Sequence, residues 1–366
     1  MRRGYANLPL HTGRAPAWLF QRMTKLAGTM AEIMVIELGA EGFLQRIADP
    51  FWFQCLGCVL GFDWHSSGLT TTTCGALKEG IRGREMDLGL FIGGGKGSAS
   101  RKTPEEIQRF SERAGTDADR LVYASRMSAK VDSAAVQNGF QVYHHCFFFT
   151  RDGQWAVVQQ GMNEASGWAR RYHWMSDPGL DFVCEPHKAV CSDARTDGLN
   201  MVARESVASR EAATQVSRLT ADEVIRQLRI IRADEERLDL PGRHDIRASD
   251  INPDRLKDTF ARTYERQPEN FEALLGLPGV GPKTVRALSL VGALVHGAQP
   301  SFRDPARFSF AHGGKDGIPF PVDRKTYDTT VVVLEKAVAA SKLGSSEKLA
   351  SLRRMATFLS TDPSPR

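Results

Sequence analysis

Phosphate binding is the chemistry that the sequence indicates most clearly, in the run LPGVGPKT at residues 277–284. Gly279 supplies backbone freedom that a residue with a Cβ lacks, and Gly281 lets a ligand approach the chain closely. Pro282 suits the first turn of a helix, where its missing N–H is not needed. The free amides and positive dipole end of that helix favour an anion, and Lys283 adds a full charge. We therefore expect this run to bind a phosphate, with an ordinary glycine turn between helices as the alternative.

Two helices must position this turn. The first spans about 268–277 and places Phe271, Leu274 and Leu275 on one face, and the second spans about 282–295. The run resembles the hairpin of helix-hairpin-helix modules, because it matches the pattern hydrophobic-x-G-hydrophobic-G-x-[KR] at every position. That resemblance implies DNA as the partner, gripped by its backbone without base reading. The residues expected to contact DNA here are Gly279, Gly281, Lys283 and Thr284.

A β-hairpin is predicted in the N-terminal half of the chain. Strand-like runs at 141–150 and 154–162 flank Asp152-Gly153, and a D-G pair is a hairpin signal. With these two residues as the loop, His145 lies opposite Gln160. Both runs are apolar near the turn on both faces, which predicts a central strand pair covered from each side.

Polar side chains gather at the other end of this hairpin, where His144, His145, Gln159 and Gln160 meet. Such a gathering is typical of a ligand or metal pocket. Adjacent histidines point to opposite faces of a strand, so at most one of them can address a given site. The alternative is one hydrogen-bonded core histidine and one solvated histidine.

Metal-assisted phosphodiester hydrolysis is one chemistry for this pocket. It needs a divalent cation, Mn²⁺ or Mg²⁺, to polarise the phosphoryl group and activate water. The candidate catalytic residues are Asp63, His65, Asp132, His144, His145 and Gln160, and the candidate metal ligands are Asp63, His65, Asp132, His144 or His145, and His173. The chain has no D-x-D or E-x-K pattern at a recognisable nuclease spacing.

Basic residues of the same region could hold DNA phosphates. The glycine-rich run 93–104 has the freedom and charge of a phosphate-holding loop, although it lacks P-loop spacing, and a flexible surface loop is the alternative. Other basic residues alternate with aromatic ones that could stack on bases. The expected phosphate contacts are Lys96, Arg101, Lys102, Lys130, Arg170 and Arg171.

The six cysteines indicate buried thiols. Cys55 and Cys58 form a C-x-x-C in an almost wholly apolar stretch, and the other four stand singly. No second pair stands at zinc-site spacing.

Long motifs resemble the DUF763 family of bacterial and archaeal proteins over nearly the whole chain. They include DPFWFQCLGCVLGFDWHSSGLTTTTCGALKEG, GGGKGSASRKTPEEI, YHHCFFF and RDPARFSFAHGGKDGIPFPVDRKTYD. This family has a recognised DNA-binding hairpin and no known function, so the resemblance brings no catalytic residues with it.

A weaker resemblance suggests a different enzyme. LPGVGPKT followed by Pro321-Val322-Asp323 is similar to the hairpin DNA glycosylases, in which a lysine at the position of Lys283 attacks the sugar and the aspartate activates it. The interval from Lys283 to Asp323 is much longer here than in those enzymes. A non-enzymatic DNA-binding adaptor is the third hypothesis. The interpretation we favour is a nuclease of DNA repair or recombination to which the hairpin delivers DNA.

Composition limits the fold. The chain has 366 residues, of which 42% are hydrophobic and 25% charged, with a net charge of +5, so DNA binding requires local basic patches. We expect an α+β domain at 14–195 with the buried hairpin, a helical connector at 196–240 and an all-α domain at 241–360 with the helix-hairpin-helix motif. No run is apolar enough to span a membrane, and no hydrophobic signal region follows the basic N-terminus, which predicts a cytoplasmic protein.

Overall fold

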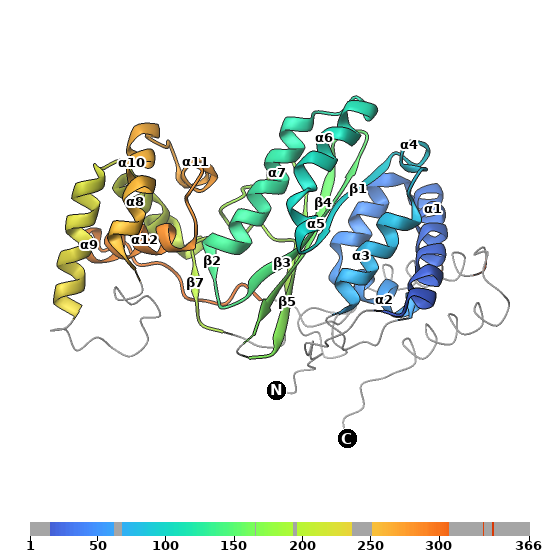
Figure 1. The fold of residues 1–366 in the computed structure, drawn as a ribbon, viewed down its shortest axis with the longest axis horizontal. Coiled ribbons are helices and arrows are strands. Elements are labelled where there is room, and N and C mark those ends of the chain that lie inside the picture. Colours follow the sequence, from blue (N-terminus) through green and yellow to red (C-terminus); the bar gives the residue numbers. More distant parts are fainter. Residues whose placement is uncertain are drawn as a thin grey trace, which may run out of the picture.

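The structure is a computed structural model that describes residues 15–61, 68–164, 166–192, 196–235 and 251–306, together with residues 332 and 339. Helices lie at both ends and an antiparallel sheet lies between them (Figure 1), so the predicted α+β class is confirmed. The α-helices are α1 (Ala17–Ala48), α2 (Pro50–Leu60), α3 (Gly68–Gly80), α4 (Glu85–Leu88), α5 (Ser98–Arg101), α6 (Thr103–Ala114), α7 (Ala118–Lys130), α8 (Val207–Ser217), α9 (Ala221–Glu235), α10 (Lys257–Arg266), α11 (Phe271–Gly276) and α12 (Pro282–His296). The strands are β1 (Leu90–Lys96), β2 (Val136–Gln137), β3 (Gln141–Thr150), β4 (Trp155–Asn163), β5 (Trp168–Met175), β6 (Ala189–Cys191) and β7 (Leu199–Asn200). A π-helix, η1 (Val131–Ala135), follows α7, and two 3-10 turns are η2 (Arg204–Ser206) and η4 (Pro253–Leu256).

Five strands form the main sheet in the order β1-β3-β4-β5-β6, with every neighbouring pair antiparallel. The hairpin of β3 and β4 is therefore central, as predicted. Its apolar side chains alternate between two cores, one under α1, α2 and α3 and the other under α6 and α7 (Figure 1). Burial on both faces explains why these strands are apolar almost throughout near the turn.

The turn between β3 and β4 has three residues, not the predicted two. Thr150 N–H donates to the Gln154 carbonyl at 2.9 Å, and Gly153 has a left-handed φ of +77°, the geometry of a three-residue hairpin loop. The register therefore shifts by one, so His145 pairs with Gln159 and not with Gln160. A bulge at Tyr143 precedes His144, which pairs with Gln160 on the opposite face.

The glycines at 93–95 lie in edge strand β1, paired with β3, and not in a loop as expected. Gly94 has φ +90°, and a Cβ there would lie 2.2 Å from the His145 carbonyl oxygen. Glu106 accepts from the Gly94 amide at 2.6 Å, and the Lys78 ammonium donates to the Gly94 carbonyl at 2.9 Å. The glycines thus allow close backbone packing, and the predicted phosphate-holding loop is wrong for this segment.

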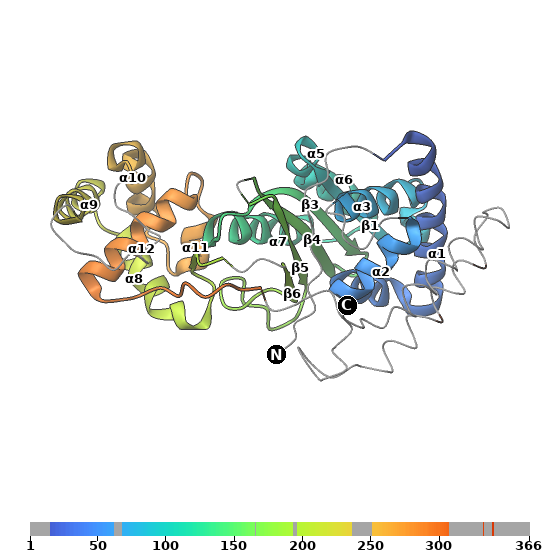
Figure 2. The same ribbon diagram turned by 90° about the horizontal axis from the view of Figure 1, so that it is seen from below.

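The C-terminal helices pack on one another and on α7. A Cβ on Gly292 of α12 would lie 3.0 Å from the Ala212 Cβ of α8, so the two helices approach closely. The sequence Thr220-Ala-Asp-Glu223 has the capping-box pattern, which predicts the start of a helix. In the structure the Thr220 amide donates to the Glu223 carboxylate and the Glu223 amide donates to the Thr220 hydroxyl, at the start of α9. After α12 the chain runs back toward the sheet (Figure 2), where Asn200 N–H donates to the Ser301 carbonyl.

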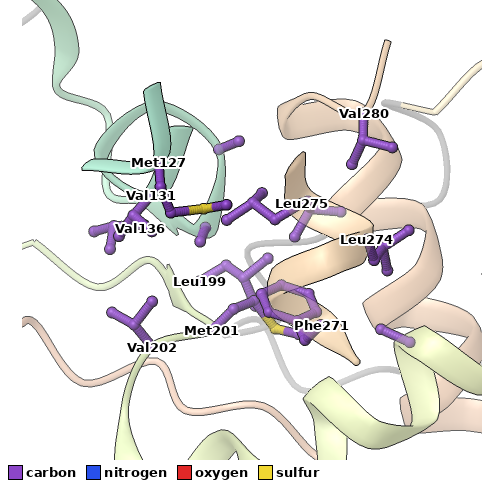
Figure 3. Packing of buried hydrophobic residues seen from close by; sticks show 14 of the residues in the cluster. Met127, Val131, Val136, Leu199, Met201, Val202, Phe271, Leu274, Leu275 and Val280 are labelled. Carbon is purple, nitrogen blue, oxygen red and sulfur yellow. The ribbon is translucent and has the colours of Figure 1, made fainter. Parts of the chain in front are cut away.

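A continuous apolar core joins α7 and the π-helix to α11. Met127 and Val131 pack here with Leu274 and Leu275, and Met201 lies beside them (Figure 3). This core fixes the position of the hairpin motif relative to the sheet.

Five of the six cysteines are buried and Cys184 is half-buried, and all six are free thiols. Burial raises the pKa of the Cys55 and Cys74 thiols, which keeps both protonated. Within the described part of the chain, no helix combines the length and apolar character needed to cross a bilayer.

Candidate functional site

The predicted helix-hairpin-helix geometry is present, with α11, a five-residue turn and α12. Asn270 caps α11 by accepting from the Ala273 amide at 2.8 Å. Gly279 has φ +88°, a conformation that glycine adopts without strain. Gly281 is the N-cap of α12, and Pro282 follows at the first helical position.

Three alternate carbonyls of this turn are held by donors from other elements. The Pro278 carbonyl accepts from Arg262 of α10 at 2.7 Å. The Val280 carbonyl accepts from the Lys130 ammonium at the end of α7, which also donates to the Leu277 carbonyl at 3.3 Å. The Pro282 carbonyl accepts from the Gln137 side-chain amide at 2.9 Å.

These anchors orient the amides of the turn. In a trans peptide the C=O and the next residue's N–H point in opposite directions. With the carbonyls of 278, 280 and 282 held inward, the N–H groups of Gly279, Gly281 and Lys283 point away from the protein. None of these three has a hydrogen-bond partner among the described residues. Gly279 and Lys283 are exposed and Gly281 is half-exposed, so all three amides can reach an external anion.

The open space beside Gly281 has no explanation in the described part of the fold. Its φ of −136° and ψ of −169° are extended values that any residue adopts. A Cβ built on it would meet no described atom within 4 Å. Neither the backbone conformation nor the packing among described residues requires glycine at position 281. Close approach of a ligand to the backbone would require it. Thr284, by contrast, is 1% exposed, so its side chain belongs to the core and not to the predicted DNA contact.

One face of α7 contacts the hairpin through three side chains. The Tyr123 hydroxyl donates to Glu272 of α11 at 2.5 Å, and Lys130 holds the turn. Between them lies Met127, whose methyl group would be 3.5 Å from a Cβ placed on Gly276 of α11. This spacing of four and three residues puts all three side chains on one helix face.

The π-helix after α7 positions Asp132 in the core on the same side of the sheet. Its carboxylate is fully buried and accepts from Gln159 at 2.6 Å, the Trp174 indole at 2.9 Å and His187 at 2.5 Å. π-Helical turns are rare and often occur at functional sites. Here the extra residue turns the carboxylate toward three donors of the sheet and its flanking loop.

His145 belongs to the same network. The Gln159 amide nitrogen donates to Asp132, so its oxygen faces His145 and accepts from Nδ1–H at 2.9 Å. His145 Nε2 then accepts from the Ser125 hydroxyl at 2.9 Å. Burial lowers the pKa of His145, consistent with this neutral tautomer. This chain of hydrogen bonds from Ser125 to Asp132 orients the buried groups, and it is closed to substrate because Ser125 is 2% exposed.

His144 and His173 lie on the opposite face of the sheet. His173 Nδ1 donates to the Ile47 carbonyl at 3.0 Å and Nε2 accepts from Arg171 at 2.9 Å, so no ring lone pair is left for a metal. His144 is 1% exposed, and neither ring nitrogen has a partner in the described structure. Burial, with Lys96 and His145 nearby, lowers the pKa of His144 to about 3.

The candidate metal ligands therefore separate. Asp132 and His145 share one face and His144 and His173 the other, and the described residues contain no group of three or more His, Cys, Asp or Glu side chains that could hold a metal. The described candidates Asp132, His144, His145 and His173 therefore do not converge on one cation position. Asp63, His65 and the proposed lyase residue Asp323 lie outside the described residues.

A family model described as "Protein of unknown function (DUF763)" matches residues 4–322. The chain belongs to the DUF763 family. No curated protein and no solved structure matches it.

Two predicted DNA contacts of this DUF763 protein are wrong in this conformation. Arg170 and Arg171 are fully buried and cannot reach DNA. Arg170 pairs with Asp304 at 2.7 Å, and its guanidinium lies 4.3 Å from the centre of the Phe140 ring. Arg171 donates to Gln54 at 2.8 Å. Both residues join the sheet to distant segments.

The other predicted phosphate contacts differ in exposure. Lys96, Arg101 and Lys102 are exposed around the end of β1 and α5, where they are free to meet a polyanion. Lys130 is half-buried, and its ammonium is turned onto the hairpin carbonyls. Direct phosphate contact by Lys130 is therefore inconsistent with this geometry.

Two residues that hold carbonyls of the turn, and one partner of Asp132, were not among the candidates from the sequence. Gln137 and Arg262 hold these carbonyls, and His187 completes the Asp132 network. Single polar residues carry no motif, so only their spatial neighbours reveal these roles.

Proposed function

We propose that this DUF763 protein binds the sugar–phosphate backbone of DNA through the turn at 277–283. The observation that carries this proposal is the set of three outward amides, at Gly279, Gly281 and Lys283, whose carbonyl partners are each tied inward. A phosphate that accepts from them fills the open space beside Gly281. The location we propose for this activity is the cytoplasm.

Charge favours an anion at this turn. Lys283 is exposed at the first turn of α12, where the helix dipole is positive. Arg262 and Lys130 place two more positive charges directly behind the turn. Backbone amides and cations recognise phosphates whatever the base, so we expect binding with little sequence preference.

The test is equilibrium binding of a labelled duplex, a single strand and an RNA strand, followed by fluorescence anisotropy over a range of salt concentrations. Lys283→Met should weaken duplex binding and lower the steepness of the log–log salt dependence by about 0.9, the share of one phosphate contact. Lys25→Met is the matched control, because Lys25 is exposed on α1 at the far end of the molecule (Figure 1). Equal duplex affinity for wild type and Lys283→Met would contradict the proposal.

Catalysis is a separate prediction with its own assay. Incubating DNA with Mn²⁺ or Mg²⁺, and in parallel with EDTA, tests the nuclease hypothesis. Borohydride trapping on abasic DNA that disappears in Lys283→Ala tests the lyase hypothesis. DNA binding without either activity would support the hypothesis of a non-enzymatic DNA-binding adaptor. The buried Asp132 network gives the nuclease no open metal position among the described residues, so we rest the proposal on binding alone.

A further inference from the structure

The Lys130 ammonium occupies an unusual position directly behind the hairpin turn. Lys130 ends α7, is half-buried, and donates to the carbonyls of Val280 and Leu277. The described residues place no carboxylate within ion-pair distance of it, so its charge is balanced only by carbonyl oxygens. Because the side chain is half-buried, solvent screens this charge less than it screens a surface lysine, and the same burial lowers the pKa of the ammonium.

The Val280 carbonyl and the Gly281 N–H belong to one peptide unit. An ammonium on the oxygen side polarises that unit and makes its N–H a stronger donor. A phosphate oxygen on the N–H side would lie about 8 Å from the ammonium nitrogen, the length of one peptide unit and two hydrogen bonds. The two charges cannot touch, yet they attract through a partly desolvated peptide.

We propose that Lys130 is a positioning residue that acts as an embedded counter-charge, raising the affinity of the Gly281 amide for a DNA phosphate without contacting it. This inference rests on the proposed function. It corrects the sequence-based expectation that Lys130 meets phosphate directly.

Comparison with Gln137 indicates that the positive charge of Lys130 has a role beyond anchoring a carbonyl. Gln137 holds the Pro282 carbonyl at 2.9 Å with a neutral amide, so anchoring a carbonyl of this turn does not require a cation. At the central peptide the chain carries an ammonium instead. The other charged or titratable groups on the elements packed here are Asp119, Arg120, Tyr123 and Arg126 of α7, Asp132 of η1, Glu272 of α11, and Lys283, Arg286 and His296 of α12. Arg262 of α10 reaches the turn at the Pro278 carbonyl.

The experiment compares Lys130→Gln, which keeps a donor but loses the charge, Lys130→Arg, which keeps both, and Lys283→Met. Duplex affinity is measured over a range of salt concentrations, below the melting temperature of the least stable variant. We expect Lys130→Arg to bind within about threefold of wild type and Lys130→Gln about tenfold more weakly, from a charge about 8 Å away at intermediate dielectric. We also expect Lys130→Gln to keep the wild-type salt slope, whereas Lys283→Met lowers it by about 0.9.

Three results would overturn this inference. Wild-type affinity in Lys130→Gln would make Lys130 a tether only. A salt slope lowered as in Lys283→Met would make it a direct phosphate contact. Weak duplex binding by both Lys130→Gln and Lys130→Arg would show that the size and geometry of the lysine side chain matter, and not its charge. A wild-type protein that binds no DNA would instead overturn the proposed function itself.

Discussion

Replacing Gly281 by alanine distinguishes a glycine that serves ligand binding from a glycine that serves only the structure of the turn. The backbone at Gly281 suits any residue, and the added Cβ meets no described atom within 4 Å. Alanine restricts the unfolded chain, which stabilises by about 0.4–1 kcal/mol, but it is a poorer N-cap residue than glycine, which offsets a similar amount. The free energy of unfolding should therefore change by less than about 1 kcal/mol. A glycine required by the fold would give a larger loss.

DNA binding should fall in the same variant, because the methyl group lies where a phosphate would approach the Gly281 amide. A charge-assisted hydrogen bond contributes about 1.5–3 kcal/mol, so its loss lowers affinity roughly 10- to 150-fold. Urea unfolding and duplex anisotropy on one preparation give both quantities.

Gly279→Ala is the matched comparison. Gly279 has φ +88°, and a Cβ there would lie 2.6 Å from an Arg262 guanidinium nitrogen. This variant should lose about 1–2 kcal/mol of stability as well as DNA affinity, because the left-handed conformation strains alanine. A phosphate site at Gly281 is contradicted if Gly281→Ala binds duplex DNA like wild type, or if it is destabilised as much as Gly279→Ala.

Other perturbations test the buried polar groups. Asp304→Ala strands the Arg170 charge in the core and should cost about 3–5 kcal/mol in urea unfolding, whereas a cost below about 1 kcal/mol would contradict a buried pair. Asp132→Ala leaves three buried donors without an acceptor and should destabilise by a similar amount; near-wild-type stability would argue against the network. The folded pKa of His144 is about 3 against 6.5 unfolded, so below pH 6.5 only the unfolded chain takes up this proton, and stability is lost as pH falls toward 3. Between pH 6.5 and 5 this residue should remove about 1–2 kcal/mol, a loss that His144→Gln reduces and the exposed-residue control His296→Gln retains.

Local chemistry made part of the fold predictable. The glycine and proline positions of the hairpin, the continuous apolar run of β3 near its turn and the capping box at Thr220 each act within a few residues, and the structure contains all three. The β3–β4 turn was misjudged by one residue because a D-G pair also suits the last two positions of a three-residue loop.

Long-range partners account for the remaining errors. Arg170 and Arg171 form a basic pair in the sequence, but burial on both faces of β5 turns each into the core. Asp304 lies 134 residues from Arg170 in the chain, so no local pattern links them. The π-helix at Asp132 likewise has no sequence signal, and without it His187 is a single loop histidine.

Hydrogen–deuterium exchange with and without a saturating duplex measures whether DNA covers the hairpin turn. Phosphate binding there predicts slower amide exchange in the peptide covering 277–284, which includes the outward N–H groups of Gly279, Gly281 and Lys283, and unchanged exchange in α1. Saturated DNA binding with unprotected exchange at 277–284 would contradict it.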